Sequence, residues 1–316
     1  MIISASRRTD LPAAHAEWLL RRLREGYALV RNPMNPHSVQ RIELRPECVD
    51  GIVLWTKNPG PLLDRLDALA PYAYYFQYTL TAYGSDVEPK LPDHETRIGS
   101  FLRLSEQIGP ERVLWRYDPI LISARYPAEW HLEAFRRMAE RLRGATHQVT
   151  VSFVDVYSRN RKRLEKLGAQ SISASEMRRV AAEIARIAAV NDMTAVACSE
   201  TIDLRDCGVA PACCVDAERL GRIGGIPLRA GKDPNQRAAC GCAPSVDIGA
   251  YNTCSNGCQY CYANYAPSLL AENLRRADAD SPLLCSRIGE NDKITLRKMP
   301  IMRETQMKMC FERKEI

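Results

Sequence analysis

This chain of 316 residues lacks the long apolar segments of a membrane protein. No hydrophobic run approaches the roughly 20 residues that are needed to cross a bilayer. Residues Met1–Arg8 have no basic segment ahead of their short apolar run, and they lack the longer hydrophobic stretch of a signal peptide. We therefore expect a cytoplasmic protein that does not associate with membranes.

The chain also has few histidines and a small net charge. All five histidines precede residue 150, so the later part of the chain has no Cys–His set of the kind that holds structural zinc. The formal charge of +6 is mild and the arginines are dispersed, so charge alone does not indicate a nucleic-acid-binding surface. The chain is 46% hydrophobic and 26% charged, an ordinary globular balance that excludes general disorder.

Cysteine, by contrast, is abundant, with 12 residues in the chain. Cys48 stands alone in the first 190 residues, and most of the others lie between Cys198 and Cys261. A reducing compartment does not favour a disulfide framework. The distribution therefore indicates metal or redox chemistry in the last third of the chain.

Short β-rich apolar runs alternate with longer helical patterns over the first 200 residues. The expected strands are Ile2–Ala5, Gly51–Trp55, Tyr74–Leu80, Arg112–Arg116, Val149–Val154 and Thr194–Cys198. The expected helices are about Leu11–Glu25, Pro61–Leu69, Asp93–Ile108, Ala128–Leu142, Ser158–Leu167 and Ser173–Asn191. Strand alternating with helix predicts parallel βαβ units. Six or more units favour an α/β fold of the TIM type, either a complete or a partial (β/α) barrel.

Four segments follow from these patterns. Residues 1–200 are expected to form the main part of the barrel, with an inserted loop and short strand pair at Val30–Leu44. Residues 201–244 form a cysteine-rich, loop-rich segment. Residues 245–277 add one more strand and one more helix, at Ser245–Ala250 and Ala263–Arg276. Residues 278–316 form a C-terminal tail with little pattern beyond Ile294–Leu296.

Three cysteines, Cys254, Cys258 and Cys261, lie within eight residues. Several thiolates from one short loop are typical ligands of an iron–sulfur cluster. Three protein ligands leave one iron of a [4Fe–4S] cluster open to another ligand, as a catalytic zinc keeps one position open. Structural zinc is the competing interpretation, but no partner pair and no histidine follow Cys261.

The spacing Cys254-x-x-x-Cys258-x-Tyr260-Cys261, with an aromatic residue before the third cysteine, resembles the signature of the radical S-adenosylmethionine superfamily. The continuation through Tyr262-Ala263-Asn264 is similar to the variant in spore photoproduct lyase and its relatives. The resemblance implies that the three cysteines ligate a [4Fe–4S] cluster whose open iron takes S-adenosylmethionine, with Tyr260 beside the cofactor. It further implies reductive cleavage to a 5′-deoxyadenosyl radical, which abstracts hydrogen from a substrate.

A wider resemblance covers nearly the whole chain and points to an uncharacterised bacterial family, a domain of unknown function. The segments that carry it are Ser4–Asp10, Arg31–Pro36, Trp55–Pro59, Trp115–Pro119, Cys240–Cys242 and Ser245–Cys254. In most radical S-adenosylmethionine enzymes the cysteine loop follows the first strand, whereas here it lies near the C-terminus. A circular permutation reconciles the two, with Ser245–Ala250 as the first strand of the barrel. The superfamily's usual Gly-Gly-Glu element has no obvious match.

A second set of cysteines precedes the motif. We expect Cys198, Cys214, Cys240 and Cys242 to bind an auxiliary [4Fe–4S] cluster, with a structural zinc on the same ligands as the alternative. Cys207 and Cys213 belong to the same stretch. The remaining Cys48, Cys285 and Cys310 fit buried free thiols better.

Polar residues follow the expected strands, at the end of a parallel barrel where active sites form. Lys57, Arg116 and Asp118 are the candidate catalytic residues, because the two cations could hold an anionic group of the substrate or cofactor. The candidate cofactor-binding residues are Arg7, Arg8, Asp10, Asn58, Gln77, Ser152, Glu200 and Tyr260. Structural ion pairs of Arg7 and Arg8 with Asp10 and Asp118 are the alternative.

The sequence therefore predicts a radical S-adenosylmethionine enzyme of unknown substrate, whether small molecule, peptide or nucleic acid. An external one-electron donor such as flavodoxin or ferredoxin is an expected partner. Two alternatives remain open, a DNA-lesion repair enzyme resembling spore photoproduct lyase and a non-catalytic iron–sulfur or zinc protein.

Overall fold

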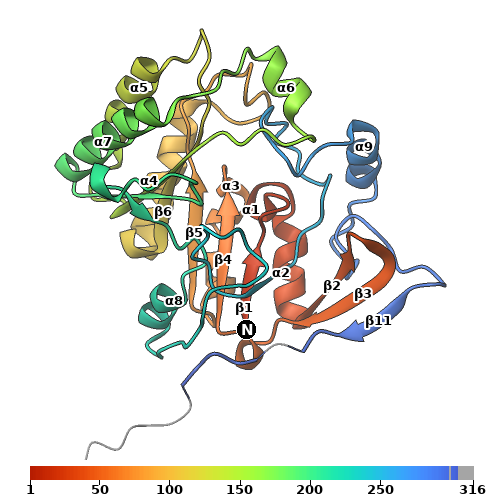
Figure 1. Ribbon diagram of the computed structural model, residues 1–316. Helices are drawn as coiled ribbons and strands as arrows, with labels where there is room; N and C mark the ends of the chain where they lie inside the picture. The colour runs from red at the N-terminus through yellow and green to blue at the C-terminus, as the bar shows by residue number, and fades with distance from the viewer. Residues whose placement is uncertain (299, 305–316) are drawn as a thin grey trace, which may run out of the picture.

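A parallel β-sheet organises the molecule, and the computed structural model describes residues 1–298 and 300–304. The strands stand in the order β10 (Ser245–Asp247), β1 (Ile2–Ala5), β4 (Gly51–Thr56), β5 (Tyr74–Thr79), β6 (Val113–Ile120), β7 (Gln148–Phe153), β8 (Thr194–Ala197) and β9 (Ala210–Pro211) (Figure 1). Every neighbouring pair is parallel. In the described part of the chain no pairing joins β9 to β10, so the structure is an eight-stranded parallel sheet without barrel closure. The predicted α/β class is confirmed.

Helices connect the strands, as the alternating pattern predicts. They are α1 (Leu11–Ala14), α2 (Ala16–Glu25), α3 (Gly60–Leu63), α4 (His94–Ile108), α5 (Ala128–Leu142), α6 (Arg161–Lys166), α7 (Ala174–Val190), α8 (Ala217–Gly224) and α9 (Pro267–Arg275). No helix among the described residues is long and apolar enough to cross a membrane.

The expected single helix over 11–25 is interrupted at His15. Its backbone leaves the helical region, with φ −142° and ψ 37°, and separates α1 from α2. The His15 ring instead bonds the carbonyl oxygen of Thr253 at 2.8 Å. The helix is therefore interrupted at the residue whose side chain binds the cysteine loop.

The segment 201–244, predicted as loop-rich, contains the helix α8. Asp216 caps its start by accepting a hydrogen bond from the Arg219 backbone at 3.1 Å, and Gly225 ends it with φ 69°. Asp and Gly are common at helix ends, but the apolar stripe between them is short, so the sequence did not predict this helix.

A smaller sheet lies beside the large one, in the order β11 (Lys293–Leu296), β3 (Asn35–Glu43) and β2 (Tyr27–Asn32). The β2–β3 hairpin is the strand pair expected in this region. Strand β11 runs parallel to β3 and gives the predicted tail a structural role that the sequence did not indicate. Figure 1 shows this sheet at the lower right, away from α6 at the top.

The two faces of the large sheet have different coverings. On one face, side chains such as Ile3, Phe76 and Trp115 pack with apolar residues of helices α2, α4, α5 and α7. On the opposite face, Ile2, Val53, Tyr75 and Leu114 pack with the cysteine-rich segment, including Cys214, Leu220, Cys240 and Cys242. Alternate residues of a strand point to opposite faces, so the same strands serve both cores. The cysteine-rich segment is therefore part of the hydrophobic core.

Replacing the cap of α8 tests its contribution to this second core. Asp216→Ala should lower the free energy of unfolding by about 1 kcal/mol, because the Arg219 N–H loses its acceptor. Asp216→Asn should retain most of that stability, since Asn also caps helices. Urea denaturation of both variants measures the free energy of unfolding. Equal decreases in the two variants would show that the capping hydrogen bond does not provide this stability.

Candidate functional site

The three motif cysteines lie on one loop that follows β10. Residues 248–266 contain no helix or strand. Cys258 is buried, and Cys254 and Cys261 are half-buried. Gly257 has φ 73°, and a Cβ there would lie 3.3 Å from Cγ of Pro89. The turn before Cys258 therefore requires glycine.

Hydrogen bonds from distant segments fix the start of this loop. The His15 ring bonds the Thr253 carbonyl oxygen, and the Asn264 side-chain amide donates to the Cys254 carbonyl oxygen at 2.6 Å. Oδ1 of Asn264 is buried and has no hydrogen-bond partner among the described residues. A polar group of a bound molecule would satisfy this atom.

The far end of the loop is held by the segment that leads into α6. The Arg163 guanidinium donates to the carbonyl oxygens of Cys261 and Asn264. Asn160 donates from its amide to the carbonyl oxygen of Tyr260 at 3.0 Å. All three bonds connect residues about 100 positions apart, so the loop geometry depends on the tertiary fold.

Asp10, one of the predicted cofactor-binding residues, supports the same loop. Its buried carboxylate accepts hydrogen bonds from the backbone of Lys57 at 2.8 Å, the backbone of Ala13 at 3.0 Å and the side chain of Asn256 at 3.0 Å. Burial raises the pKa of Asp10, and these bonds oppose the rise. Asp10 is therefore a fixed support beneath the cysteine loop.

The thiols of the loop interact electrostatically. Burial raises the pKa of Cys254 to about 12, and the charges of Asp10 and Cys261 add to the rise. Burial also raises the pKa of Cys258, while the nearby Lys57 ammonium lowers it. A metal that takes these sulfurs as thiolates must offset this cost of ionisation.

Single-ion coordination does not match the arrangement of these groups. Within residues 1–298 and 300–304, no three Cys, His, Asp or Glu side chains are placed to hold one metal ion. Zinc binds sulfur at about 2.3 Å, so its ligand sulfurs must crowd around one point. A cubane takes each thiolate on a different iron and separates the sulfurs more widely. Three cysteines on one short loop are typical ligands of an iron–sulfur cluster, in which each sulfur binds a different iron.

A buried carboxylate that the sequence reasoning missed, Glu88, connects the loop to the sheet. It accepts hydrogen bonds from Lys57 Nζ at 2.9 Å, Arg97 Nη1 at 3.0 Å and Thr81 Oγ1 at 2.9 Å, and from the Tyr260 hydroxyl. Burial acts to raise its pKa, but the two cations prevail and lower it, so Glu88 is charged. Its partners come from separate elements, and no local pattern in the sequence identifies it.

The second missed residue is Asp247, at the end of β10. Its carboxylate accepts hydrogen bonds from Ser4 Oγ at 3.1 Å, Ser6 Oγ at 2.6 Å, the Arg7 backbone at 2.8 Å and the Gly249 backbone at 3.0 Å. It therefore ties β10 to β1. Its position within the Ser245–Cys254 resemblance segment was the available signal.

Arg7 and Arg8 lie beside this junction. The Arg7 guanidinium donates to Ser245 Oγ at 3.0 Å and lies 5.9 Å from the ring of Trp55. The Arg8 guanidinium lies 4.0 Å from Asp247 and 5.2 Å from the ring of Tyr251. Among the described residues neither pairs with Asp10 or Asp118, so the alternative of those ion pairs is wrong.

The second cysteine group lies on the sheet face covered by the cysteine-rich segment. The Cys214 and Cys198 sulfurs are 3.4 Å apart, and Cys242 Sγ accepts the Val215 backbone N–H at 3.4 Å. Cys240 is buried in the same core. Cys213 instead directs its thiol to the carbonyl oxygens of Val215 and Gly241, and Cys207 lies beside Asp206.

Arg116 lies against this group. Its guanidinium donates to Cys214 Sγ at 3.0 Å, to Gln77 Oε1 at 3.2 Å, and to the Asp118 carboxylate. Asp118 also accepts from the Ser152 hydroxyl. Four predicted site residues are thus in one network with Cys214. The Arg116 guanidinium is paired with the Asp118 carboxylate, just as the Lys57 ammonium is paired with Glu88.

Glu200 lies at the same rim. Its carboxylate accepts the Phe153 backbone N–H at 2.8 Å. Burial raises the pKa of Glu200 to about 7, and the charges of Asp155 and Asp118 add to the rise. This carboxyl exchanges a proton near neutral pH.

The remaining predicted residues have plainer surroundings. The Asn58 side chain forms a local hydrogen bond, in which its Oδ1 accepts the Gly60 backbone N–H at 3.1 Å. Cys285 is buried as expected, whereas Cys48 is only half-buried. Cys310 lies outside the described residues.

The two cysteine groups are connected along one rim by aromatic residues. The rings of Tyr157 and Tyr262 are 5.8 Å apart, and Tyr262 directly follows Cys261. The Tyr157 hydroxyl donates to Asp155 at 2.9 Å. Burial and Asp155 raise the pKa of Tyr157, and a charge on Cys198 adds to the rise. Tyr157 is therefore close to both groups.

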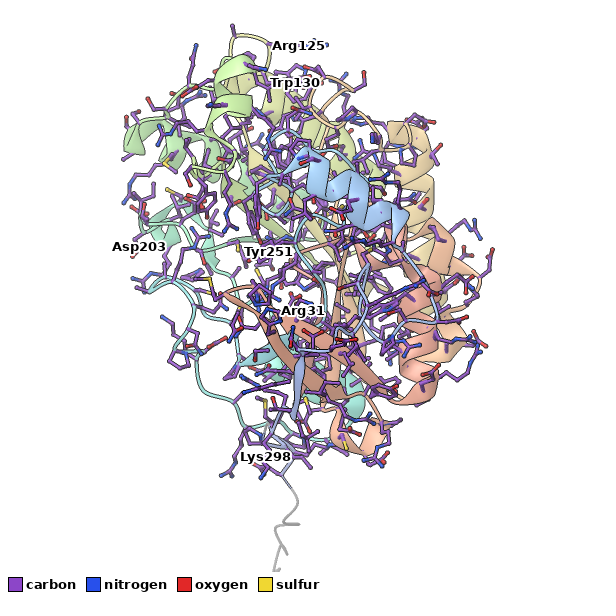
Figure 2. The ribbon with its side chains drawn as sticks, turned by 90° about the vertical axis from the view of Figure 1, so that its right-hand side faces the viewer. Arg31, Arg125, Trp130, Asp203, Tyr251 and Lys298 are labelled. Carbon is purple, nitrogen blue, oxygen red and sulfur yellow. The ribbon has the colours of Figure 1, made fainter. Side chains whose placement is uncertain are left out.

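A cavity of about 390 Å³ lies behind the start of the loop. Arg8, Arg31, Tyr251 and Asn273 line it, together with Gly249–Thr253. Figure 2 looks onto this face, where Tyr251 and Arg31 lie below the blue helix α9. Asp292 pairs with Arg31 at 2.6 Å. A molecule in this cavity would contact the backbone that leads into Cys254.

A comparison with protein families gives one match. The family model described as a domain of unknown function, DUF1848, matches residues 2–263. The chain belongs to the DUF1848 family. No curated protein and no solved structure matches it. The match spans both cysteine groups and the strands β1 to β10.

Glu88 should be the most sensitive charged residue of this DUF1848 chain. Glu88→Ala leaves Arg97 and Lys57 buried without their carboxylate, and should lower the free energy of unfolding by about 3–5 kcal/mol. Glu129→Ala is the matched control, because Glu129 pairs with Arg179 at 2.9 Å on the surface and should cost less than about 1 kcal/mol. Urea denaturation of the metal-free chain measures both, and equal effects would contradict the prediction.

Proposed function

We propose that this protein is a radical S-adenosylmethionine enzyme. The observation that carries the proposal is the position of Cys254, Cys258 and Cys261 on one anchored loop that follows β10. The spacing with Tyr260 resembles the superfamily signature, and no partner pair of cysteines and no histidine follow Cys261. In this proposal the three thiolates hold a [4Fe–4S] cluster. When bound, the cluster and S-adenosylmethionine supply a 5′-deoxyadenosyl radical for hydrogen abstraction.

The residues of the chain position and shield this site. Glu88 holds both the Lys57 ammonium and the Tyr260 hydroxyl, so Tyr260 cannot move independently of the sheet. Lys57 Nζ lies 5.3 Å from the centre of the Tyr260 ring and favours the thiolate of Cys258. Asp10 fixes Asn256 within the loop. These residues hold the loop in place before any ligand binds.

The substrate side of the site is the rim formed by Arg116, Asp118, Ser152 and Glu200. Arg116 and Lys57 already have carboxylate partners, so an anionic substrate would share these cations rather than find them free. The side chain of Asp118 is 20% exposed and that of Arg116 only 5%, so a substrate reaches Asp118 first. Gln77 holds Arg116 from beneath.

The order of the strands supports a permuted fold. Strand β10 carries the cysteine loop at its end and lies at the sheet edge next to β1. We interpret β10 as the first strand of a partial barrel, followed by β1, β4, β5, β6, β7 and β8. The cysteine-rich segment covers the face that would be the inside of that barrel.

We further propose that Cys198, Cys214, Cys240 and Cys242 hold a second metal centre, an auxiliary cluster or a zinc. The 3.4 Å separation of the Cys198 and Cys214 sulfurs places two donors together, and the Arg116 guanidinium beside Cys214 acts to lower the pKa of that thiol. The described cysteines are free thiols. A reducing compartment such as the cytoplasm suits them, and an external one-electron donor is required.

Anaerobic reconstitution tests the reaction. With iron, sulfide and dithionite, the protein should convert S-adenosylmethionine to 5′-deoxyadenosine and methionine, measured by liquid chromatography. Cys258→Ala should abolish this product, because the thiol is a ligand. Cys207→Ala should leave it unchanged, because that thiol lies apart from both groups. Absence of cleavage by reconstituted wild-type protein would support a non-catalytic metal protein instead.

Metal analysis tests the second centre. In the triple variant Cys254→Ala, Cys258→Ala, Cys261→Ala, roughly four irons per chain should remain if the auxiliary site holds a [4Fe–4S] cluster. One zinc and no iron would identify zinc as its metal. A triple variant without any metal would contradict the second centre.

A further inference from the structure

A cluster of basic residues lies on α6 and the turn before it. Five basic residues occur within eight positions: Arg159, Arg161, Lys162, Arg163 and Lys166. The structure gives none of them an ion pair within the described residues, although Glu165 lies among them. We call residues 159–166 the α6 surface.

Several arginines on the helices α5 and α7 have acidic partners. Arg136 pairs with Glu133 at 2.8 Å, Arg179 with Glu129 at 2.9 Å, and Arg186 with Glu183 at 2.6 Å. The absence of such partners on the α6 surface is therefore not a general property of the chain. Uncompensated charges of one sign repel each other, and an oppositely charged partner relieves that repulsion.

The α6 surface is joined directly to the cysteine loop. Arg163 donates to the carbonyl oxygen of Cys261, and Asn160 to that of Tyr260. In Figure 1, α6 lies at the top, beside the blue loop that leads toward α9. A molecule bound here lies next to the third motif cysteine.

Exposed apolar and aromatic side chains adjoin these charges. Val156 is 51% exposed, Tyr262 42%, and Tyr157 and Tyr265 39% each. The Arg159 guanidinium lies 4.2 Å from the centre of the Tyr265 ring. An apolar centre with a charged margin is typical of a protein interface.

We infer that the α6 surface is the docking site of an acidic one-electron carrier protein. This inference rests on the proposed function, which requires one electron from outside. In the transfer, the reduced carrier loses one electron and the enzyme's redox centre gains it, with no bond formed or broken. The basic residues are confined to one short segment beside the cysteine loop, whereas tracking a nucleic-acid strand needs a longer basic groove. The geometry therefore favours the carrier.

Charge reversal tests the surface without touching the loop. The variant Arg161→Glu, Lys162→Glu, Lys166→Glu changes exposed side chains and leaves Arg163 in place. Binding of a bacterial flavodoxin to the full metal-free chain, measured by calorimetry at low salt, should weaken about tenfold or more. The difference should shrink near 1 M salt, where the screening length falls to about 3 Å.

A matched control carries the same change in charge elsewhere. Arg24→Glu, Lys293→Glu, Lys298→Glu alters exposed residues on α2 and in the β11 region, and Figure 2 shows Lys298 at the bottom of the molecule. This control should bind flavodoxin like the wild type. Equal weakening in both variants would overturn the docking site, because it would show an effect of net charge alone.

Reduction experiments separate this inference from the proposed function. With dithionite, wild type and α6 variant should form 5′-deoxyadenosine equally, whereas with reduced flavodoxin the variant should be about tenfold slower. Equal rates with flavodoxin would overturn the docking site and leave the enzyme activity intact. No product with either reductant would refute the activity itself. Loss of binding to a 20-nucleotide single strand, with flavodoxin binding unchanged, would assign the surface to nucleic acid.

Discussion

The carboxylate of Asp247 is the contact on which the candidate site depends. It accepts four hydrogen bonds, from Ser4 in β1, from Ser6 and Arg7 in the turn that follows, and from Gly249, and so fixes the register of two segments about 240 residues apart. The cysteine loop begins a few residues later. This junction fixes the start of the loop, and the bonds of His15 to Thr253 and of Asp10 to Asn256 hold its later part. The paired strands alone, three residue pairs long, offer few other bonds.

A second constraint comes from charge in the interior. Glu88, Arg97 and Lys57 lie in a low-dielectric region where each charge alone would be costly. Glu88 pairs with both cations, and the Tyr260 hydroxyl of the cysteine loop also donates a hydrogen bond to Glu88. The second cysteine group repeats this arrangement, since Arg116 lies between Asp118 and Cys214. In both places a cation adjoins sulfur, which suits anionic ligands of a metal.

The sequence predicted the large elements because their apolar patterns are strong. Ile2–Ala5 and Ala128–Leu142 are confirmed residue for residue. It did not predict α8, whose apolar stripe is too short, or the interruption at His15, which a contact with Thr253 imposes. The strand-end rule located Asp10, Lys57 and Arg116 near the cysteines. Glu88 and Asp247 were missed because their roles come from partners distant in the chain, which no local pattern records.

The pairing of β1 with β10 has a consequence for synthesis of the protein on the ribosome. Strand β1 emerges first, but its partner emerges only after residue 245. At 5–20 residues per second, one edge of the nascent sheet stays unpaired for on the order of ten to fifty seconds. An open edge can pair with other chains, although four residues make a short target. The short length of β1 therefore limits such pairing until β10 arrives.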